Sequence, residues 1–334
     1  MMKVNLTILL FSTIITQNSI FAEQPDWNQW RGSNRDAVVT GKAWPNDLKA
    51  SHFALKWSVK MGSSYSGPIM DGKTIYVTES SGDNEVVRAL DRTTGKEKWR
   101  HTWGGKMRVP FFAAKNGSWI RSTPALANDK LFVAGMRDHL LCIDTKTGKR
   151  LWEIDFPKEH KTPVPSFGCV CSPMVDDKYV YMQAGAAFCK IEQDTGKIVW
   201  QSMKDKGGMY GSAFSSPVFA TLRDKEQILV QSRTELAGVD IDSGKILWRQ
   251  PIKAFRGMNI LTPLPYNNGV YTSAYGGRSH FFGIKRDQQS WKSAEQWENK
   301  GQAYMGSPIL FEDHVYLHLR NQRFACYNLK TGKE

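Results

Sequence analysis

The chain has 334 residues, of which 41% are hydrophobic, 12% aromatic and 23% charged. This composition excludes a disordered chain and supplies enough Trp, Phe and Tyr to bury a sizeable core. The net charge is +13, but the basic residues are spread along the chain, so we expect a solvated basic surface and no nucleic-acid partner.

Residues 1–22 are typical of a secretory signal peptide. Lys3 precedes an apolar run from Leu6 to Ile15, and Ala22 offers a cleavage site before Glu23. The run is shorter than the roughly 20 residues that span a bilayer, and no later segment is long enough, so we predict export without a transmembrane segment. A Trp-rich N-terminal extension is predicted over residues 23–51.

From about residue 52 the sequence repeats a unit of about 44–53 residues. One signature is Asp-x-x-Thr-Gly-x-x-x-Trp, complete at Asp91 to Trp99, with the glycine recurring at 95, 148, 196, 244 and 332. A second signature is a proline preceded by Ser, Thr or Gly, at 68, 124, 173, 217, 263 and 308. One copy of the first signature is missing, near Ile284 to Trp291, where the turn is degenerate.

Each unit predicts four strands. The proline opens a short apolar run, a turn such as Asp71-Gly72-Lys73 follows, and a β-branched or aromatic run such as Thr74 to Val77 comes next. The third strand ends in the Asp of the first signature, and the fourth carries its Trp. Four strands per unit at this period predict an all-β propeller of four-stranded blades over residues 52–334, with six blades visible.

The repeated residues have structural roles in this arrangement. Glycine provides the left-handed conformation of the turn, and Asp can accept backbone N–H bonds within it. The Trp on the outer strand can pack between neighbouring blades and donate its N–H to a backbone carbonyl. We assign this docking role to Trp57, Trp99, Trp152, Trp200 and Trp248.

The run Ala89 to Trp99 resembles the tryptophan-docking repeat of the quinoprotein propellers, which are named after pyrroloquinoline quinone (PQQ). Trp27 to Gly32, followed by Trp44-Pro45, resembles the start of exported, planctomycete-type PQQ-binding-like propellers. The resemblance implies a bacterial periplasmic or extracellular protein. It also implies about seven or eight blades, so we expect an incomplete ring in which Phe53 to Val59 forms a lone outer strand.

Two functions remain open. Quinoprotein dehydrogenases, which are similar in fold, carry adjacent cysteines on the cofactor and a calcium held by carboxylate and amide groups. Here the nearest match is Cys169-Val170-Cys171, and the calcium ligands have no assignable positions. We therefore predict a monomeric, non-catalytic binding or scaffold protein of the bacterial cell envelope. The alternative is a PQQ- and calcium-dependent dehydrogenase of alcohols or sugars.

The segments that enter the first strand of each blade are the candidate ligand site. Such segments ring one mouth of a propeller channel, and aromatic, Arg and amide groups on a concave mouth suit a protein, peptide or glycan ligand. The residues are Tyr65, Trp119, Arg121, Tyr210, Arg256, Asn259 and Tyr304. We expect them to face one concavity, although simple packing of this face is an equal alternative. Cys169, Cys171 and Cys189 are close enough in the repeat to pair, or else remain buried thiols.

Overall fold

The computed structural model describes residues 27–334 apart from residues 40, 42–43 and 289. The predicted signal peptide lies outside the described residues. In the described part, the strands form five four-stranded sheets and one three-stranded sheet, each an antiparallel meander in which successive strands pair. We call these sheets blades 1 to 6 in chain order.

The strand boundaries follow the repeat. Blades 1 and 2 contain β1 (Ile69–Met70), β2 (Thr74–Ser81), β3 (Asn84–Asp91), β4 (Glu97–Gly104), β5 (Ala125–Ala127), β6 (Lys130–Gly135), β7 (His139–Asp144) and β8 (Arg150–Asp155). Blades 3 and 4 contain β9 (Met174–Val175), β10 (Tyr179–Ala184), β11 (Ala187–Glu192), β12 (Ile198–Ser202), β13 (Val218–Leu222), β14 (Lys225–Gln231), β15 (Glu235–Asp240) and β16 (Ile246–Pro251). Blades 5 and 6 contain β17 (Leu264–Tyr266), β18 (Gly269–Ser273), β19 (Ser279–Arg286), β20 (Trp291–Asn299), β21 (Ile309–Phe311), β22 (His314–His318) and β23 (Phe324–Asn328).

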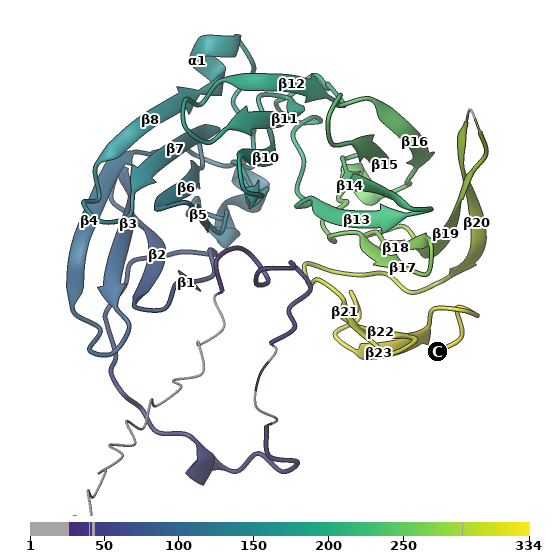
Figure 1. Cartoon of the computed structure of the whole chain (residues 1–334), viewed down its shortest axis with the longest axis horizontal. Helices are drawn as coiled ribbons and strands as arrows, with labels where there is room; N and C mark the ends of the chain where they lie inside the picture. The colour runs from purple at the N-terminus through teal and green to yellow at the C-terminus, as the bar shows by residue number, and fades with distance from the viewer. Residues whose placement is uncertain (1–26, 40, 42–43, 289) are drawn as a thin grey trace, which may run out of the picture.

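The blades are arranged around a common axis, with the first strand of each blade innermost and the last outermost (Figure 1). This arrangement confirms the predicted all-β propeller. The helices are short and lie in the connections. They are α1 (Phe156–His160) and the 3-10 turns Ala50–His52, Phe111–Asn116 and Phe255–Gly257. In Figure 1 the arc is open between blade 1 and blade 6.

In blades 2 to 4 the two middle strands are buried along most of their length because each of these blades packs between two neighbours, whereas β22 and β23 of blade 6 bury only alternate residues. In β6 every residue after Lys130 is buried, and in β11 every residue before Glu192 is buried. Such strands appear in sequence as nearly continuous apolar runs instead of alternating ones. The core therefore lies between the blades, where Phe132 and Leu140 of blade 2 share a cluster with Val180 of blade 3.

The hydroxyl residues before the repeated prolines link neighbouring blades near the axis. The Thr123 hydroxyl accepts a hydrogen bond of 2.9 Å from the Gly67 N–H, and the Ser172 hydroxyl accepts one of 3.0 Å from the Thr123 N–H. The Ser172 N–H donates in turn to the Ser216 hydroxyl at 2.9 Å. Because the following proline has no N–H, these bonds hold the inner strands where the ladder offers none.

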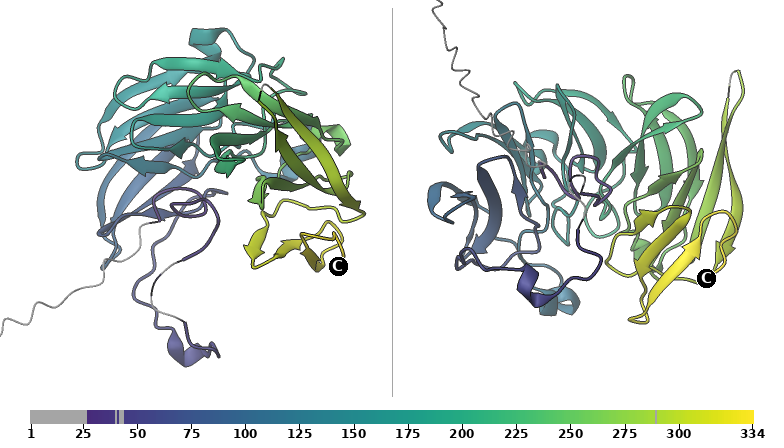
Figure 2. Two further views of the ribbon diagram at one scale, coloured as in Figure 1. Left: turned by 45° about the vertical axis from the view of Figure 1, so that its right-hand side comes forward. Right: turned by 60° about the horizontal axis from the view of Figure 1, so that its bottom comes forward.

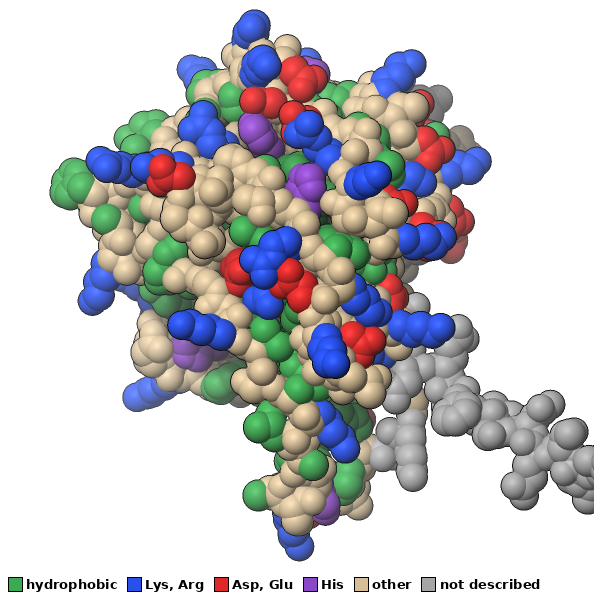
Figure 3. Space-filling view, turned by 90° about the vertical axis from the view of Figure 1, so that its left-hand side faces the viewer, with side chains coloured by type: hydrophobic (Ala, Val, Ile, Leu, Met, Phe, Trp, Pro, Cys, Tyr) green, Lys and Arg blue, Asp and Glu red, His purple; other side chains and the backbone are tan. Residues whose placement is uncertain are grey.

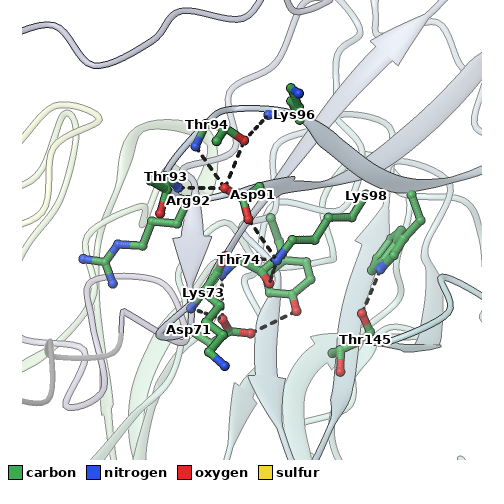
Figure 4. Close-up of polar contacts among 12 residues, drawn as sticks. Asp71, Lys73, Thr74, Asp91, Arg92, Thr93, Thr94, Lys96, Lys98 and Thr145 are labelled. Carbon is green, nitrogen blue, oxygen red and sulfur yellow. Dashed lines mark hydrogen bonds and ion pairs between the residues drawn. The ribbon is translucent and has the colours of Figure 1, made fainter.

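The turn between the third and fourth strands has the same geometry in most blades. In blade 1, Oδ1 of Asp91 accepts the N–H groups of Thr93 and Thr94 at 3.0 and 2.9 Å, as Figure 4 shows. Gly95 follows with φ at 71°, in the left-handed region. Hydrogen bonds from Thr94 are the main cause that lowers the pKa of the Asp91 carboxyl.

A tryptophan packs on each of these glycines, from the outer strand of the preceding blade or, for Gly95, from the segment that carries Trp57. A Cβ atom on Gly148 would lie 2.7 Å from the ring of Trp99, so the turn requires glycine for space as well as for conformation. The indole N–H then donates to the backbone carbonyl just after the turn's first residue, at 2.7–3.2 Å. The donor and acceptor pairs are Trp57–Arg92, Trp99–Thr145, Trp152–Gln193, Trp200–Ile241 and Trp297–Leu329.

Two details differ from the sequence prediction. The Trp248 indole N–H does not donate to the next blade: it donates to Oε1 of Gln227 in its own blade, at 2.7 Å, while the ring packs in a cluster with Phe282 and Ile284 of blade 5. The missing copy of the turn, expected near Ile284 to Trp291, is replaced by a long hairpin of β19 and β20 (Figure 2). The docking residue of blade 5 is therefore Trp297, which the sequence analysis missed.

The segment that carries Trp57 is docked but does not form a strand. Residues 53–62 contain no strand, and the ring of Trp57 packs on Gly95 of blade 1. Blade 6 has three strands among the described residues, so Phe53 to Val59 does not pair beside β23.

Residues 27–37 cross the axis of the ring and contact the inner strands. Trp27 forms a bridge with Met70 of blade 1, and the Leu126 N–H of blade 2 donates to the Asn28 carbonyl at 2.7 Å. Further contacts reach blades 3 and 6: Arg35 donates to the carbonyls of Ser172 and Pro173, and Arg31 donates to that of Pro308. Residues 27–37, part of the predicted N-terminal extension, thus contact the inner strands of blades 1 and 2 and the segments that enter blades 3 and 6.

No helix in the described ranges is long and apolar enough to cross a membrane. On the face in Figure 3, Lys and Arg side chains are interspersed with Asp and Glu and do not gather into one patch. This distribution agrees with the spread of charge along the sequence.

Candidate functional site

The connections between blades all lie on one face of the ring. Each runs from the end of an outermost strand to the start of the next innermost strand, so the topology places them together with the turns between second and third strands. We call this surface the crossing face. It contains residues 63–68, 105–124, 156–173, 203–217, 252–263 and 300–308, and the turns 82–83, 136–138, 185–186, 232–234, 274–278 and 319–323.

Three of the predicted site residues form one cluster on the crossing face. The ring centres of Tyr65 and Trp119 are 5.4 Å apart, and the Arg121 guanidinium lies 5.3 Å from the Tyr65 ring centre. Arg121 also donates to the carbonyl of Gly117 at 3.0 Å. Burial lowers the pKa of Arg121, which indicates that its charge is held in a poorly solvated position.

The other four predicted residues lie elsewhere on this face. Asn259 is fully buried and donates to the Arg233 carbonyl at 3.1 Å, and no described residue offers a hydrogen bond to its Oδ1. Arg256 stacks on Phe255, and the Tyr304 ring contacts Tyr275 at 5.7 Å.

Tyr210 stands apart from these contacts, with 79% of its surface exposed. The predicted residues therefore lie on one face but form separate groups of contacts, and a single concavity shared by all seven stays a prediction.

Arg233, in the turn between β14 and β15, is the centre of the second group and was missed in the sequence analysis. It is 5% exposed, and its guanidinium donates to backbone carbonyls of two different crossings. Its acceptors are the carbonyls of Met209, Gly211, Arg256 and Gly257, at 2.6–3.3 Å. No repeated motif marks this residue, so its role could not be read from the sequence.

A row of aromatic side chains joins the crossings between blades 1 and 4. Phe112 contacts Phe167 with ring centres 6.1 Å apart, and Phe167 contacts Phe214 at 5.7 Å. The Arg233 guanidinium lies 4.3 Å from the Phe214 ring centre, which continues the row by a cation–π contact. At the other end, Phe111 packs on Phe112 and is 92% exposed.

A groove of about 360 Å³ opens further along the same face, between blades 5 and 6. Phe255 and Tyr275 provide aromatic walls, and the Arg320 guanidinium lies 4.5 Å from the Tyr275 ring centre. Lys253 adds a second cation, and none of the lining residues is acidic. The signal that could have found this groove is the aromatic and basic content of the turn 274–278 and the turn 319–323.

Two carboxyl groups are buried at this face, between blades 1, 2 and 3. Glu85 is 2% exposed and accepts the Trp103 indole N–H at 2.8 Å and the Met136 N–H at 3.0 Å. Asp138 is 3% exposed and accepts the Gly185 N–H at 2.7 Å. Burial raises the pKa of Glu85 to about 7 and that of Asp138 to about 6.

All five cysteines are free thiols, and Cys142, Cys169, Cys171 and Cys189 are buried. Burial raises the pKa of Cys171 to about 11 and that of Cys189 to about 12, so these thiols stay protonated near neutral pH. In the structure Cys169, Cys171 and Cys189 are therefore buried free thiols and form no disulfide with one another.

The described residues do not fit the dehydrogenase site that the resemblance implies. Cys169 and Cys171 are 4% and 0% exposed, so neither sulfur presents a surface to a cofactor. Arg35 of the N-terminal segment lies near Cys171 and donates to the Ser172 and Pro173 carbonyls. The buried carboxyls Glu85 and Asp138 each accept a backbone N–H, from Met136 and Gly185 respectively.

One group of side chains among the described residues could hold a metal ion. His280, Glu295 and Glu298 place one ligand atom each within 4.8 Å of the others. They lie on β19 and β20, where a bulge at Gln296 brings both glutamates toward His280. The His280 Nδ1 atom already contacts Glu295 at 2.8 Å, and Arg278 contacts Glu298 at 3.0 Å, so ion pairs explain the cluster.

Comparison with known proteins agrees with this architecture. A family model described as outer membrane protein assembly factor BamB (PQQ_2) matches residues 82–334. The structure of BamB from Moraxella catarrhalis superposes with a TM-score of 0.60 at 16% identity, covering 81% of this chain and 75% of that chain. This likeness concerns the fold.

Curated relatives are similar over shorter stretches. The 1-butanol dehydrogenase (cytochrome c) of Thauera butanivorans is 26% identical over 186 residues, which are 54% of this chain and 26% of that protein. The quinohemoprotein alcohol dehydrogenase ADH-IIG of Pseudomonas putida is 27% identical over 167 residues, which are 47% of this chain and 22% of that protein. The chain thus spans about a quarter of the length of these relatives.

The extent of the family match, together with the repeated docking turns, decides the classification. The chain belongs to the PQQ-repeat β-propeller family whose model is described as outer membrane protein assembly factor BamB.

Proposed function

We propose that the protein is an exported, non-catalytic binding or scaffold protein of the bacterial cell envelope, and that it holds its ligand on the crossing face. The observation that carries this proposal is the row of contacts from Phe111 through Phe112, Phe167 and Phe214 to Arg233. Aromatic and Arg side chains are enriched where proteins bind proteins, peptides and glycans.

The exposure along this row supports a binding role over a packing role. Phe111 and Phe112 are 92% and 53% exposed, although each is an apolar ring that would gain by burial. Exposed apolar groups gathered on one face mark an interaction surface, whereas singly scattered ones do not. The inner end of the row is fixed by Arg233, so the exposed rings stand on a rigid base.

The test is co-sedimentation of the purified mature protein with bacterial envelope fragments. We expect the double variant Phe111→Ser/Phe112→Ser to lower the bound fraction. A matched variant, Leu55→Ser/Leu151→Ser, changes exposed apolar residues outside the crossing face and should bind like the wild type. Equal binding by all three proteins would exclude the aromatic row as the binding surface.

Export is tested on the full chain expressed in bacteria. We expect the mature protein to appear in the periplasmic or extracellular fraction and its N-terminal residue to be Glu23. A protein that retains residues 1–22 and stays in the cytoplasmic fraction would contradict this part of the proposal.

A PQQ- and calcium-dependent dehydrogenase of alcohols or sugars is the second candidate, and the similarity to the two named dehydrogenases favours it. Purified protein would be mixed with PQQ and calcium and examined for quinone absorbance and for dye reduction with alcohols or sugars. Saturable binding with turnover would favour the enzyme; envelope binding without turnover would favour the scaffold.

A further inference from the structure

At the junction between blades 4 and 5, the Trp248 N–H does not donate to a backbone carbonyl of the next blade, as Trp200 and Trp297 do at the neighbouring junctions. In blades 1 to 4 the carbonyl that accepts the N–H of the preceding tryptophan lies three residues after the residue that pairs with the blade's own tryptophan. In blade 1, Ala89 pairs with Trp99, and the carbonyl of Arg92, three residues later, accepts from Trp57. In blade 5 this position is Ile284, because Phe281 pairs with Trp297. The Ile284 carbonyl accepts instead from Nε of Arg223 at 2.8 Å.

The hairpin of blade 5 lies beside the outer strand of blade 4. The inserted part extends β19 to Arg286 and starts β20 at Trp291. The Ser293 hydroxyl lies 3.2 Å from the Arg249 carbonyl and 3.1 Å from Oε1 of Gln250. β16 and β20 are each the last strand of their sheets, so each has one edge that pairs with no strand of its own sheet.

A groove of about 500 Å³ occupies this space. Its walls are residues 246–250 of β16 and residues 291–293 of β20. The Trp248 N–H donates within its own blade, while its ring is 3% exposed, packs in a cluster with Phe282 and Ile284 of blade 5 and forms part of the groove wall. The groove therefore lies at the junction where the tryptophan N–H makes no bond to the next blade.

The walls combine an aromatic surface with positive charge. Arg249 and Lys292 line the groove, and the Arg286 guanidinium lies 5.1 Å from the ring centre of Trp291. None of the lining residues is acidic. Glu235 on β15 lies 3.6 Å from Arg249, and neither Lys292 nor Arg286 forms an ion pair with another described residue.

We propose that this groove binds an extended, acidic peptide segment of a partner protein. Arg249 and Lys292 attract its carboxylates, and Trp291 and Leu247 contact its apolar side chains on the alternate face. The edges of β16 and β20 offer backbone donors and acceptors to a chain in strand conformation. This site is separate from the crossing face, because it lies between outer strands.

The test uses a labelled, end-capped decapeptide of alternating Glu and Val, with binding followed by fluorescence anisotropy. The charge-reversal variant Arg249→Glu/Lys292→Glu should weaken binding by at least about tenfold. The matched variant Lys96→Glu/Lys149→Glu carries the same charge change at exposed positions of intact junctions and should bind like the wild type. Melting curves establish that both variants are folded.

Three further arms separate the proposal from simpler explanations. A Lys-Val decapeptide should not bind, and a Glu-Val peptide N-methylated at alternate residues should bind at least about tenfold more weakly. A heparin hexasaccharide should not displace the peptide. Equal binding of the Lys-Val peptide, or full displacement by heparin, would overturn the proposal in favour of nonspecific or glycan binding.

Failure of this proposal is distinguishable from failure of the crossing-face function. The Phe111→Ser/Phe112→Ser variant should retain full affinity for the Glu-Val peptide, because those residues lie outside the groove. Loss of peptide binding in that variant would show that the peptide occupies the crossing face instead.

Discussion

The indole N–H of Trp103 donates a hydrogen bond of 2.8 Å to Oε2 of Glu85, which is almost completely buried between blades 1 and 2. The other carboxyl oxygen accepts the Met136 N–H of the neighbouring blade at 3.0 Å. These two donors favour the ionised carboxylate, but burial is the larger effect, so the pKa of Glu85 rises to about 7.

The raised pKa of Glu85 predicts a loss of stability between weakly acidic and neutral pH. Between its ordinary value of 4.5 and about 7, the native state holds a proton that the unfolded chain has released. The stabilising contribution is thus complete below pH 4.5 and is lost as the pH rises through about 7. We expect the wild-type Tm to fall over this interval more than the Tm of Glu85→Gln.

Thermal melts of the two proteins at about pH 5 and about pH 8 measure this difference. Glu226→Gln changes an exposed glutamate and serves as the control. Asp138, whose pKa is raised to about 6, leaves a residual slope of the same sign in Glu85→Gln. Identical pH dependence in Glu85→Gln and wild type would rule out Glu85 as the titrating group.

The docking tryptophans should contribute strongly to stability. Trp200→Ala removes a half-buried ring and the bond to the Ile241 carbonyl, and we expect a loss of about 3 kcal/mol in the free energy of unfolding. Trp200→Phe keeps most of the packing and should cost about 1 kcal/mol. Denaturant titration measures both, and Trp44→Ala, at a position 62% exposed, should change little. A Trp200→Ala protein as stable as the control would remove the docking role.

The turn glycines should not tolerate alanine. Gly148→Ala forces a left-handed residue to carry a Cβ atom 2.7 Å from the Trp99 ring, and the backbone strain alone costs about 1–2 kcal/mol. Gly72→Ala is the matched control, since a Cβ atom there meets no neighbour within 4 Å. Denaturant titration should show a clear loss for the first variant and almost none for the second; equal stabilities would contradict the packing described.

Arg233 should hold the crossings in place. Arg233→Lys keeps the charge but lacks the planar fork that reaches four carbonyls, and we expect it to destabilise the protein by about 2–4 kcal/mol. Arg256→Lys, at an exposed position, should be close to neutral. The melting temperatures of the two variants test this, and similar values would mean that the Arg233 hydrogen bonds contribute little.

The thiols should react in two stages. In the native protein only Cys326, which is partly exposed, should react rapidly with Ellman's reagent. After unfolding in guanidinium, all five cysteines should react. A total of three reactive thiols in unreduced, unfolded protein would demonstrate a disulfide and contradict the free-thiol structure.

The repeat could be predicted from the sequence because its turn is local. Asp91, Thr94 and Gly95 make their bonds within a few residues of one another, so the spacing of residue types specifies the turn. Trp297 was missed because the inserted hairpin separates it from the turn that normally announces the docking residue. Arg223 could not be assigned, since its acceptor Ile284 is 61 residues away.

The crossing face was predicted as a location but not as a set of residues. Tyr65, Trp119 and Arg121 were found because aromatic and basic residues stand out in a connecting segment. The row of Phe112, Phe167 and Phe214 comes from three connections of different length, and nothing in the repeat aligns their rings. Such contacts depend on the relative placement of blades, which local patterns do not encode.

The N-terminal segment across the channel has a consequence for folding kinetics. Arg31 binds the carbonyl of Pro308, a contact between residues 277 positions apart. Loops of this length close slowly, and contacts of high sequence separation are formed late in folding. Blades 1 to 3 can assemble early and bind residues 27–35, whereas the link to blade 6 has to wait until the intervening blades are folded.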